Sequence, residues 1–182
     1  MQQDDRDGTW SFARFVLKAS SMTREDFLRE HRAPMLVQYT EPGSTSPISS
    51  SFGTLSISRA ATRAVQPLRV HSLAKRSGNP FTAMITIGRA SNNDIILPYE
   101  EISKFHAFFL EGPSGWALAD AQSMNGTWLT GGRLEANKPS PIPVGALEGA
   151  GVAVTFSGVK LVLHSPERLY ELAVAAPSSM VA

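Results

Sequence analysis

Thr86-Ile87-Gly88-Arg89 is followed along the chain by Ser103-Lys104-Phe105-His106, and then by Asp120-Ala121-Gln122-Ser123-Met124-Asn125-Gly126-Thr127. Each stretch lies where a strand-like run meets a turn. The three turns carry a guanidinium, a hydroxyl and a side-chain amide, and such turns can meet at one end of a β-sandwich. These groups together suit a phosphorylated side chain and the peptide backbone beside it.

The sequence around these stretches is typical of an all-β domain. Residues 81–87 alternate between apolar and polar side chains with a period of two, and residues 116–120 resume the alternation. A last pair of strand-like runs, 151–156 and 159–164, flanks a Ser-Gly turn. Roughly ten short strands at this spacing, from residue 67 to residue 164, predict a β-sandwich.

The flanking segments differ from this β domain. Residues 1–39 are expected to form an N-terminal extension with a helix at about 23–33, because Thr23 can cap it and Pro34 should end it. Residues 10–19 have no clear period and fit either a strand or a short helix. Residues 40–66 are rich in Ser, Thr, Pro and Gly and indicate a linker or surface loop. A short helix and tail are expected in residues 165–182, starting after Pro166.

Composition excludes several function classes. The 182 residues have a formal net charge of +1 and 18% charged residues, so we expect no broad basic face for nucleic acid. The chain has no cysteine, which excludes disulfides and thiolate metal sites and fits a cytoplasmic protein. The histidines have no metal-ligand spacing, and no apolar run is long enough to predict a membrane span. We therefore expect no metal, no cofactor and no membrane contact.

At this point the chain resembles the forkhead-associated (FHA) domain family over about residues 67–164. The resemblance is carried by Gly88-Arg89, Asn93-Asp94-Ile95, Ser103 with His106, and the run from Leu118 to Thr127. It implies an eleven-stranded β-sandwich whose loops at one end bind a phosphothreonine in an extended peptide. The implied role is a signalling adaptor in Ser/Thr kinase pathways, whose partner is a phosphothreonine-containing kinase or kinase substrate.

The resemblance also assigns expected roles to individual residues. Arg89, Ser103 and Asn125 are expected to be the main phosphopeptide contacts. Lys104 adds a charge, and Ser123 and Met124 lie with them in the site. Residues expected to support the site without touching the ligand are Gly88, Asn93, His106 and Gly126. The chain departs from the family pattern at Met124, which is often a polar Thr or Ser, and at Gly145-Ala146, where the family has a Gly-Asp turn.

Three other readings stay open beside the phosphopeptide one. An FHA fold can serve as a phosphate-independent scaffold or in self-association, and the apolar residues between Thr23 and Tyr39 must pack on this sandwich or on a neighbour's. Alternatively, a phosphorylated linker threonine such as Thr45 or Thr62 could be an intramolecular ligand. Finally, Ser103, His106 and Asp120 could be imagined as a catalytic triad. However, the chain has no nucleophile elbow, P-loop, HExxH or dinucleotide fingerprint, so we expect no enzyme.

Overall fold

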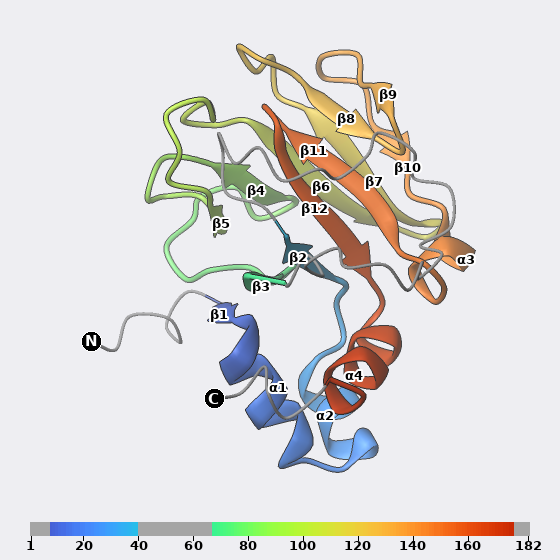
Figure 1. The fold of residues 1–182 in the computed structure, drawn as a ribbon. Helices are drawn as coiled ribbons and strands as arrows, with labels where there is room; N and C mark the ends of the chain where they lie inside the picture. The colour runs from blue at the N-terminus through green and yellow to red at the C-terminus, as the bar shows by residue number, and fades with distance from the viewer. Residues whose placement is uncertain (1–7, 40–66, 177–182) are drawn as a thin grey trace, which may run out of the picture.

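The computed structural model describes residues 8–39 and 67–176, which form two β-sheets packed face to face with helices at one end (Figure 1). The larger sheet has the spatial order β1 (Thr9–Ser11), β3 (Arg69–Ser72), β2 (Met35–Gln38), β12 (Val159–His164), β11 (Val152–Phe156), β8 (Thr127–Leu129) and β9 (Gly132–Arg133). The smaller sheet has the order β10 (Ser140–Pro141), β7 (Gly115–Asp120), β6 (Ala107–Gly112), β4 (Ile85–Gly88) and β5 (Ile95–Ile96). All strand pairs are antiparallel except β4 with β5.

The core lies between the two sheets. Strand β11 buries every second residue, and its partner β12 does so up to Leu163. The side chains on the inner face are those of Val152, Val154, Phe156, Val159, Leu161 and Leu163. The inner faces of β6 and β7 contribute Phe109 and Leu118 from the opposite sheet. The mainly β sandwich expected from the sequence is therefore confirmed. The described residues form twelve strands, where the resemblance implies eleven.

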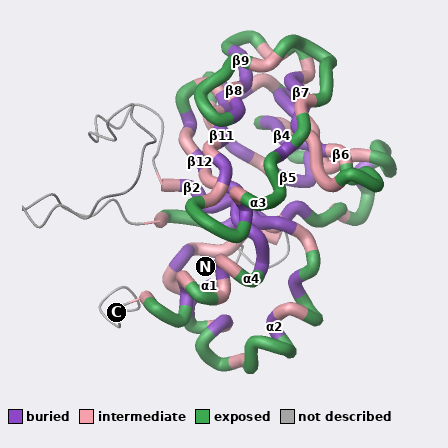
Figure 2. The backbone as a smooth tube through the Cα atoms, turned by 90° about the vertical axis from the view of Figure 1, so that its right-hand side faces the viewer, coloured by how far each residue is buried: buried purple, intermediate pink, exposed green. Residues whose placement is uncertain are grey.

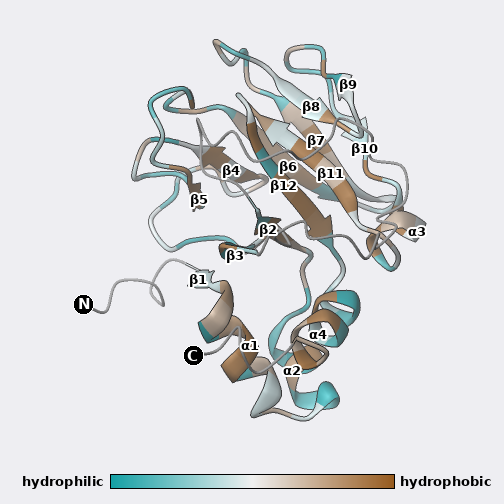
Figure 3. Ribbon diagram, viewed as in Figure 1, coloured by the Kyte–Doolittle hydropathy of each residue, from teal (hydrophilic) through white to brown (hydrophobic). Residues whose placement is uncertain are grey.

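A second apolar cluster covers the β1–β3–β2 end of the larger sheet. The helices α1 (Phe12–Ser20), α2 (Arg24–Glu30) and α4 (Pro166–Val174) lie together below the sheets in Figure 1. Their apolar sides meet those of Met35, Val37 and Val70, and Figures 2 and 3 show the buried and hydrophobic segments there. Most of the described apolar residues of the N-terminal segment thus pack on the sandwich of their own chain.

Strand β2 changes the expected organisation of the chain. It lies inside the larger sheet, between β3 and β12, so the sheet crosses the expected boundary between an N-terminal extension and a β domain starting at residue 67. All four residues of β2 are buried, because Leu36 faces the sandwich core while Met35 and Val37 face the helices. Burial on both faces removes the alternation that identifies a half-buried strand.

Local signals explain where the helices begin and end. Residues 10–19 take both of the conformations left open, first strand β1 and then helix α1, which the Ser11 hydroxyl caps by accepting from the N–H of Arg14. Thr23 caps α2 in the same way, but this helix ends at Glu30, before the residue 33 that we expected. His31 already has extended dihedrals. Gly145-Ala146 lies in the short helix α3 (Val144–Leu147) instead of a simple turn.

Two buried histidines predict that the protein is sensitive to mild acid. Burial lowers the pKa of His71 to about 3 and the pKa of His164 to about 4. The unfolded chain takes up these protons near pH 6.5, so the free energy of unfolding should fall as the pH drops from 6.5 towards 4, by roughly 1 kcal/mol per pH unit for each histidine. Urea unfolding at pH 7.5, 6.0 and 5.0 measures this change. These pH values lie above the range in which most carboxylates titrate. His164→Asn should make the free energy of unfolding depend less steeply on pH. An equal free energy of unfolding at pH 7.5 and 5.0 would contradict this account.

Candidate functional site

Three loops meet at one end of the sandwich: the loop after β4, the loop between β5 and β6, and the loop between β7 and β8. The backbone N–H of Arg89 donates to the carbonyl of Ser103 at 3.0 Å, which joins the first two loops. The N–H of Met124 donates to Oγ of Ser103 at 3.0 Å, and Nδ2 of Asn125 donates to the carbonyl of Glu101 at 2.8 Å. The structure therefore brings together the three turns that the sequence singled out.

Arg89 is positioned by the glycine before it and by the loop that it faces. A Cβ on Gly88, the last residue of β4, would lie 2.3 Å from the carbonyl oxygen of Lys104, so only glycine permits this approach of the two backbones. Nε of Arg89 donates to the carbonyl of Ile102 at 3.0 Å, which orients the guanidinium. Within residues 8–39 and 67–176, Nη1 and Nη2 of Arg89 make no hydrogen bond or ion pair, and the side chain is exposed. These donors can hold two oxygens of an anion.

His106 joins the Ser103 loop to the Asn125 loop. Its Nδ1 accepts from the N–H of Ser103 at 3.1 Å, and its Nε2 lies 3.1 Å from the carbonyl oxygen of Gly126. Burial lowers the pKa of His106, so the ring is neutral and the two partners place the proton on Nε2. Both ring nitrogens are thus used by the backbone, and Ser103, His106 and Asp120 do not assemble as a triad. The hydroxyl of Ser103 accepts from Met124 and keeps its own hydrogen for a ligand.

Asn93 is a buried brace for the same corner. Its Nδ2 donates to the carbonyl of Ala90 at 2.9 Å and to the carbonyl of Lys104 at 2.7 Å. The side chain is 4% exposed, so it acts through the loops and not on a ligand. Lys104 itself is exposed beside this corner.

Asp120 organises the loop that carries Asn125, a role that we did not assign from the sequence. Its carboxylate accepts from the N–H of Ser123 at 3.0 Å, from Oγ of Ser123 at 2.5 Å and from Oγ1 of Thr127 at 2.7 Å. Oγ of Ser123 in turn accepts from the N–H of Gly126 at 3.0 Å. The hydroxyl of Ser123 is therefore used inside the loop. The sequence signal that could have indicated this arrangement is an Asp at the end of a strand-like run followed by a Ser and an Asn-Gly pair, all residue types that favour turns.

Met124 and Asn125 form the outer surface of this loop. The Met124 side chain is 86% exposed, although its N–H is fixed by Ser103. Asn125 is exposed, and because its Nδ2 donates to Glu101, its Oδ1 can accept from the N–H of an incoming peptide. Gly126 follows with a φ of +92°, a conformation that favours glycine.

A second buried carboxylate, Asp94, fixes the outer edge of the site. It accepts from Nζ of Lys75 at 2.9 Å, from Nδ2 of Asn79 at 2.8 Å, and from the N–H groups of Arg76 and Thr86, each at 2.8 Å. Burial alone would raise the pKa of Asp94, but the backbone N–H groups of Arg76 and Thr86 and the ammonium of Lys75 hold the pKa below its ordinary value. The network ties the β3–β4 loop to strands β4 and β5.

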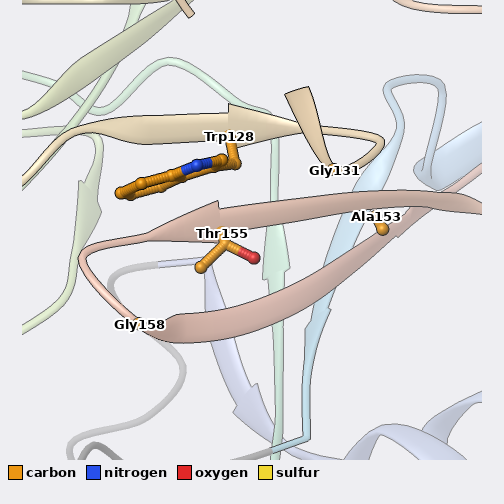
Figure 4. A pocket seen from close by; sticks show the side chains of 5 residues that line it. All are labelled: Trp128, Gly131, Ala153, Thr155 and Gly158. Atoms are coloured by element: carbon orange, nitrogen blue, oxygen red, sulfur yellow. The ribbon is translucent and has the colours of Figure 1, made fainter. Parts of the chain in front are cut away.

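A shallow hollow of about 300 Å³ lies on the outer face of the larger sheet, near the site. Figure 4 shows its lining residues, Trp128, Gly131, Ala153, Thr155 and Gly158. The described residues hold no group of three or more His, Cys, Asp or Glu side chains that could bind a metal. No described helix is both long and apolar enough to span a membrane.

Comparison with known proteins identifies the family of the site region. Residues 85–147 match the family model of the FHA domain. The chain is 31% identical over 131 residues to the ABC transporter ATP-binding/permease protein Rv1747 of Mycobacterium tuberculosis, covering 72% of this chain but only 14% of that protein.

Among solved structures, one similar fold is the N-terminal FHA domain of S. cerevisiae Rad53p in complex with a phosphothreonine peptide. It is 23% identical, with a TM-score of 0.42, and covers 57% of this chain and 89% of that one. Another is the FhaA FHA domain complexed with the intracellular domain of Rv3910. It is 14% identical, with a TM-score of 0.44, and covers 72% of this chain and all of that one (100%).

Proposed function

We propose that the FHA domain of this chain, which includes residues 85–147, binds phosphothreonine in an extended peptide and acts as a non-catalytic adaptor in Ser/Thr kinase signalling. Arg89 and Ser103 bind the phosphate, with Lys104 adding positive charge. Asn125 binds the peptide backbone beside the phosphothreonine, and Ser123 and Met124 belong to the loop that presents it. Gly88, Asn93, His106 and Gly126 hold the loops in place.

The observation that carries this proposal is the joint placement of Arg89, Ser103 and Asn125. Each side chain keeps hydrogen-bonding capacity for a ligand, while a hydrogen bond to a neighbouring loop fixes its position. A phosphothreonine carries about −1.5 to −2 charges at pH 7 and three acceptor oxygens. A planar guanidinium and a hydroxyl match those oxygens, and fixed side chains lower the entropy cost of binding.

The expected affinity is moderate. Charge-assisted hydrogen bonds contribute about 1.5–3 kcal/mol each, and ordering an extended peptide offsets part of that gain. A micromolar complex requires about 8 kcal/mol. A few such bonds reach that range, which suits a reversible signalling contact.

Two alternatives use the same fold differently. In the scaffold alternative, the domain binds proteins or itself without phosphate. One argument for it weakens, because the described N-terminal helices pack most of their apolar residues against their own sheet. In the intramolecular alternative, a phosphorylated linker threonine is the ligand. Its candidates, Thr45 and Thr62, lie outside the described residues.

Fluorescence anisotropy with one degenerate peptide library in three forms tests the proposal. The forms carry phosphothreonine, phosphoserine or unmodified threonine at the fixed central position. We expect saturable binding of the phosphothreonine library, weaker binding of the phosphoserine library and none of the unmodified one. Equal binding of all three forms by a folded protein would exclude the proposal and favour the scaffold alternative.

A further inference from the structure

Arg133, on β9, lies beside the candidate site although no role was assigned to it. It pairs across the β8–β9 ladder with Trp128. Its side chain runs back along β8 towards Gly126: a Cβ built on Gly126 would lie 2.8 Å from Nε and 3.1 Å from Nη2 of Arg133. The guanidinium therefore occupies the space that a side chain would need on the residue directly after Asn125.

This guanidinium is held in place without an acidic partner. Its Cζ lies 5.7 Å from the ring centroid of Trp128, a distance at which a cation is attracted to the face of an aromatic ring. Arg133 is exposed and forms no ion pair with any residue in 8–39 or 67–176. Glu135, the acid nearest to it in sequence, pairs with Lys138 at 3.1 Å. The charge of Arg133 thus remains available at the surface.

Asn125 consequently stands between regions of opposite charge. Its amide donates to the carbonyl of Glu101, in an exposed turn that also carries Glu100, while the glycine after it packs against Arg133. A peptide whose backbone is held by Asn125 passes both regions. An extended chain advances about 3.3 Å per residue, so Arg133 is within reach of side chains roughly one to three residues from the phosphothreonine.

We propose that Arg133 is a specificity-determining residue that binds an acidic side chain of the phosphothreonine peptide on the Gly126 side of Asn125. A guanidinium held against an aromatic ring has lost part of its freedom before binding, so a carboxylate can take a two-point contact at a lower entropy cost. The Glu100–Glu101 turn disfavours acidic residues on the other side and tolerates basic ones. The inference rests on the proposed function, because it requires a bound phosphothreonine peptide.

The test uses a set of phosphothreonine peptide libraries. In each library one position is fixed as Asp, Ala or Lys and the other positions are degenerate. The fixed position is moved from four residues before the phosphothreonine to four residues after it. Anisotropy titrations compare the wild type with Arg133→Gln and Arg133→Glu. Arg24→Gln serves as the matched control, since Arg24 is an exposed arginine on α2, in the helical cluster. Thermal unfolding verifies that each variant is folded.

For the wild type and Arg24→Gln, we expect at least one position at which Asp binds about tenfold more tightly than Lys, each charge contributing a few-fold. Arg133→Gln should remove the preference for Asp at that position and still bind only the phosphorylated peptide. Arg133→Glu should prefer Lys to Asp at the same position. Two results would overturn the role of Arg133 alone. In the first, folded Arg133→Gln keeps the preference for Asp. In the second, the wild type binds phosphothreonine peptides but shows no preference for Asp at any position. Binding without phosphate dependence, or no binding, would overturn the proposed function as well.

Discussion

Arg89→Ala is expected to abolish measurable binding of phosphothreonine peptides. Two guanidinium nitrogens of Arg89 are available to the ligand, and removing one partner of a desolvated charge pair costs about 2–5 kcal/mol. For a complex with a Kd of about 1 μM, this loss raises the Kd to between about 30 μM and several mM, and we expect Arg89→Ala to fall in the upper part of that range, beyond detection by anisotropy. The titration is run on wild type and variant with the same phosphothreonine library.

The controls separate loss of contact from loss of fold. Arg89 is exposed, and among the described residues its side chain donates one hydrogen bond. The free energy of unfolding of Arg89→Ala should therefore lie within about 1 kcal/mol of the wild-type value. Arg89→Lys keeps the charge but not the planar fork and should bind weakly. Lys104→Ala removes a neighbouring exposed cation and should reduce affinity by less than Arg89→Ala. Near-native affinity in folded Arg89→Ala would show that this arginine does not bind the phosphate.

Asp120→Ala is expected to lower the free energy of unfolding by about 3 kcal/mol and to weaken phosphopeptide binding at the same time. The buried carboxylate accepts from Ser123 through both its N–H and its hydroxyl, and from the hydroxyl of Thr127. Each buried donor left without a partner costs about 1–3 kcal/mol. Urea unfolding gives the stability change, and the phosphothreonine library gives the change in affinity.

Ser123→Ala is a milder change in the same loop, and its free energy of unfolding is compared with that of Asp120→Ala. It removes one bond to Asp120 and one from the N–H of Gly126 but leaves the carboxylate in place. We expect a loss of stability of about 1 kcal/mol, clearly smaller than that of Asp120→Ala. If the free energy of unfolding of Asp120→Ala lies within about 0.5 kcal/mol of the wild-type value, roughly half the smallest expected cost of one lost buried hydrogen bond, the carboxylate does not organise this loop.

The turns of the site could be predicted from the sequence because each has a local signature. Gly88-Arg89, Ser103 with His106, and Asn125-Gly126 follow or precede runs whose alternation indicates strands. The period-two pattern of residues 116–120 corresponds to β7, whose Leu118 lies in the core between the sheets. Local chemistry and strand period therefore predicted the three turns, and the resemblance to the FHA family predicted that they meet at one end of a sandwich.

The remaining features depend on contacts between distant residues. Strand β2 is buried on both faces, so its sequence has no alternation to separate it from a helix or a loop. Asp94 belongs to a motif that the sequence singled out, but its donors Lys75 and Asn79 lie 15 or more residues away and only the structure identifies them. Arg133 becomes notable only when the β8–β9 pairing sets it beside Trp128 and Gly126. No spacing within the chain encodes these contacts.

The most direct test of the central claim is an NMR titration of the ¹⁵N-labelled protein with a phosphothreonine peptide and with its unmodified form. We predict that only the phosphorylated peptide shifts backbone resonances. The largest shifts should fall on Arg89, on Ser103 and Lys104, and on residues 123–126, with little change in α1, α2 and α4. Shifts of equal size with both peptides, or shifts concentrated on the helices, would contradict a phosphothreonine site at the loop end of the sandwich.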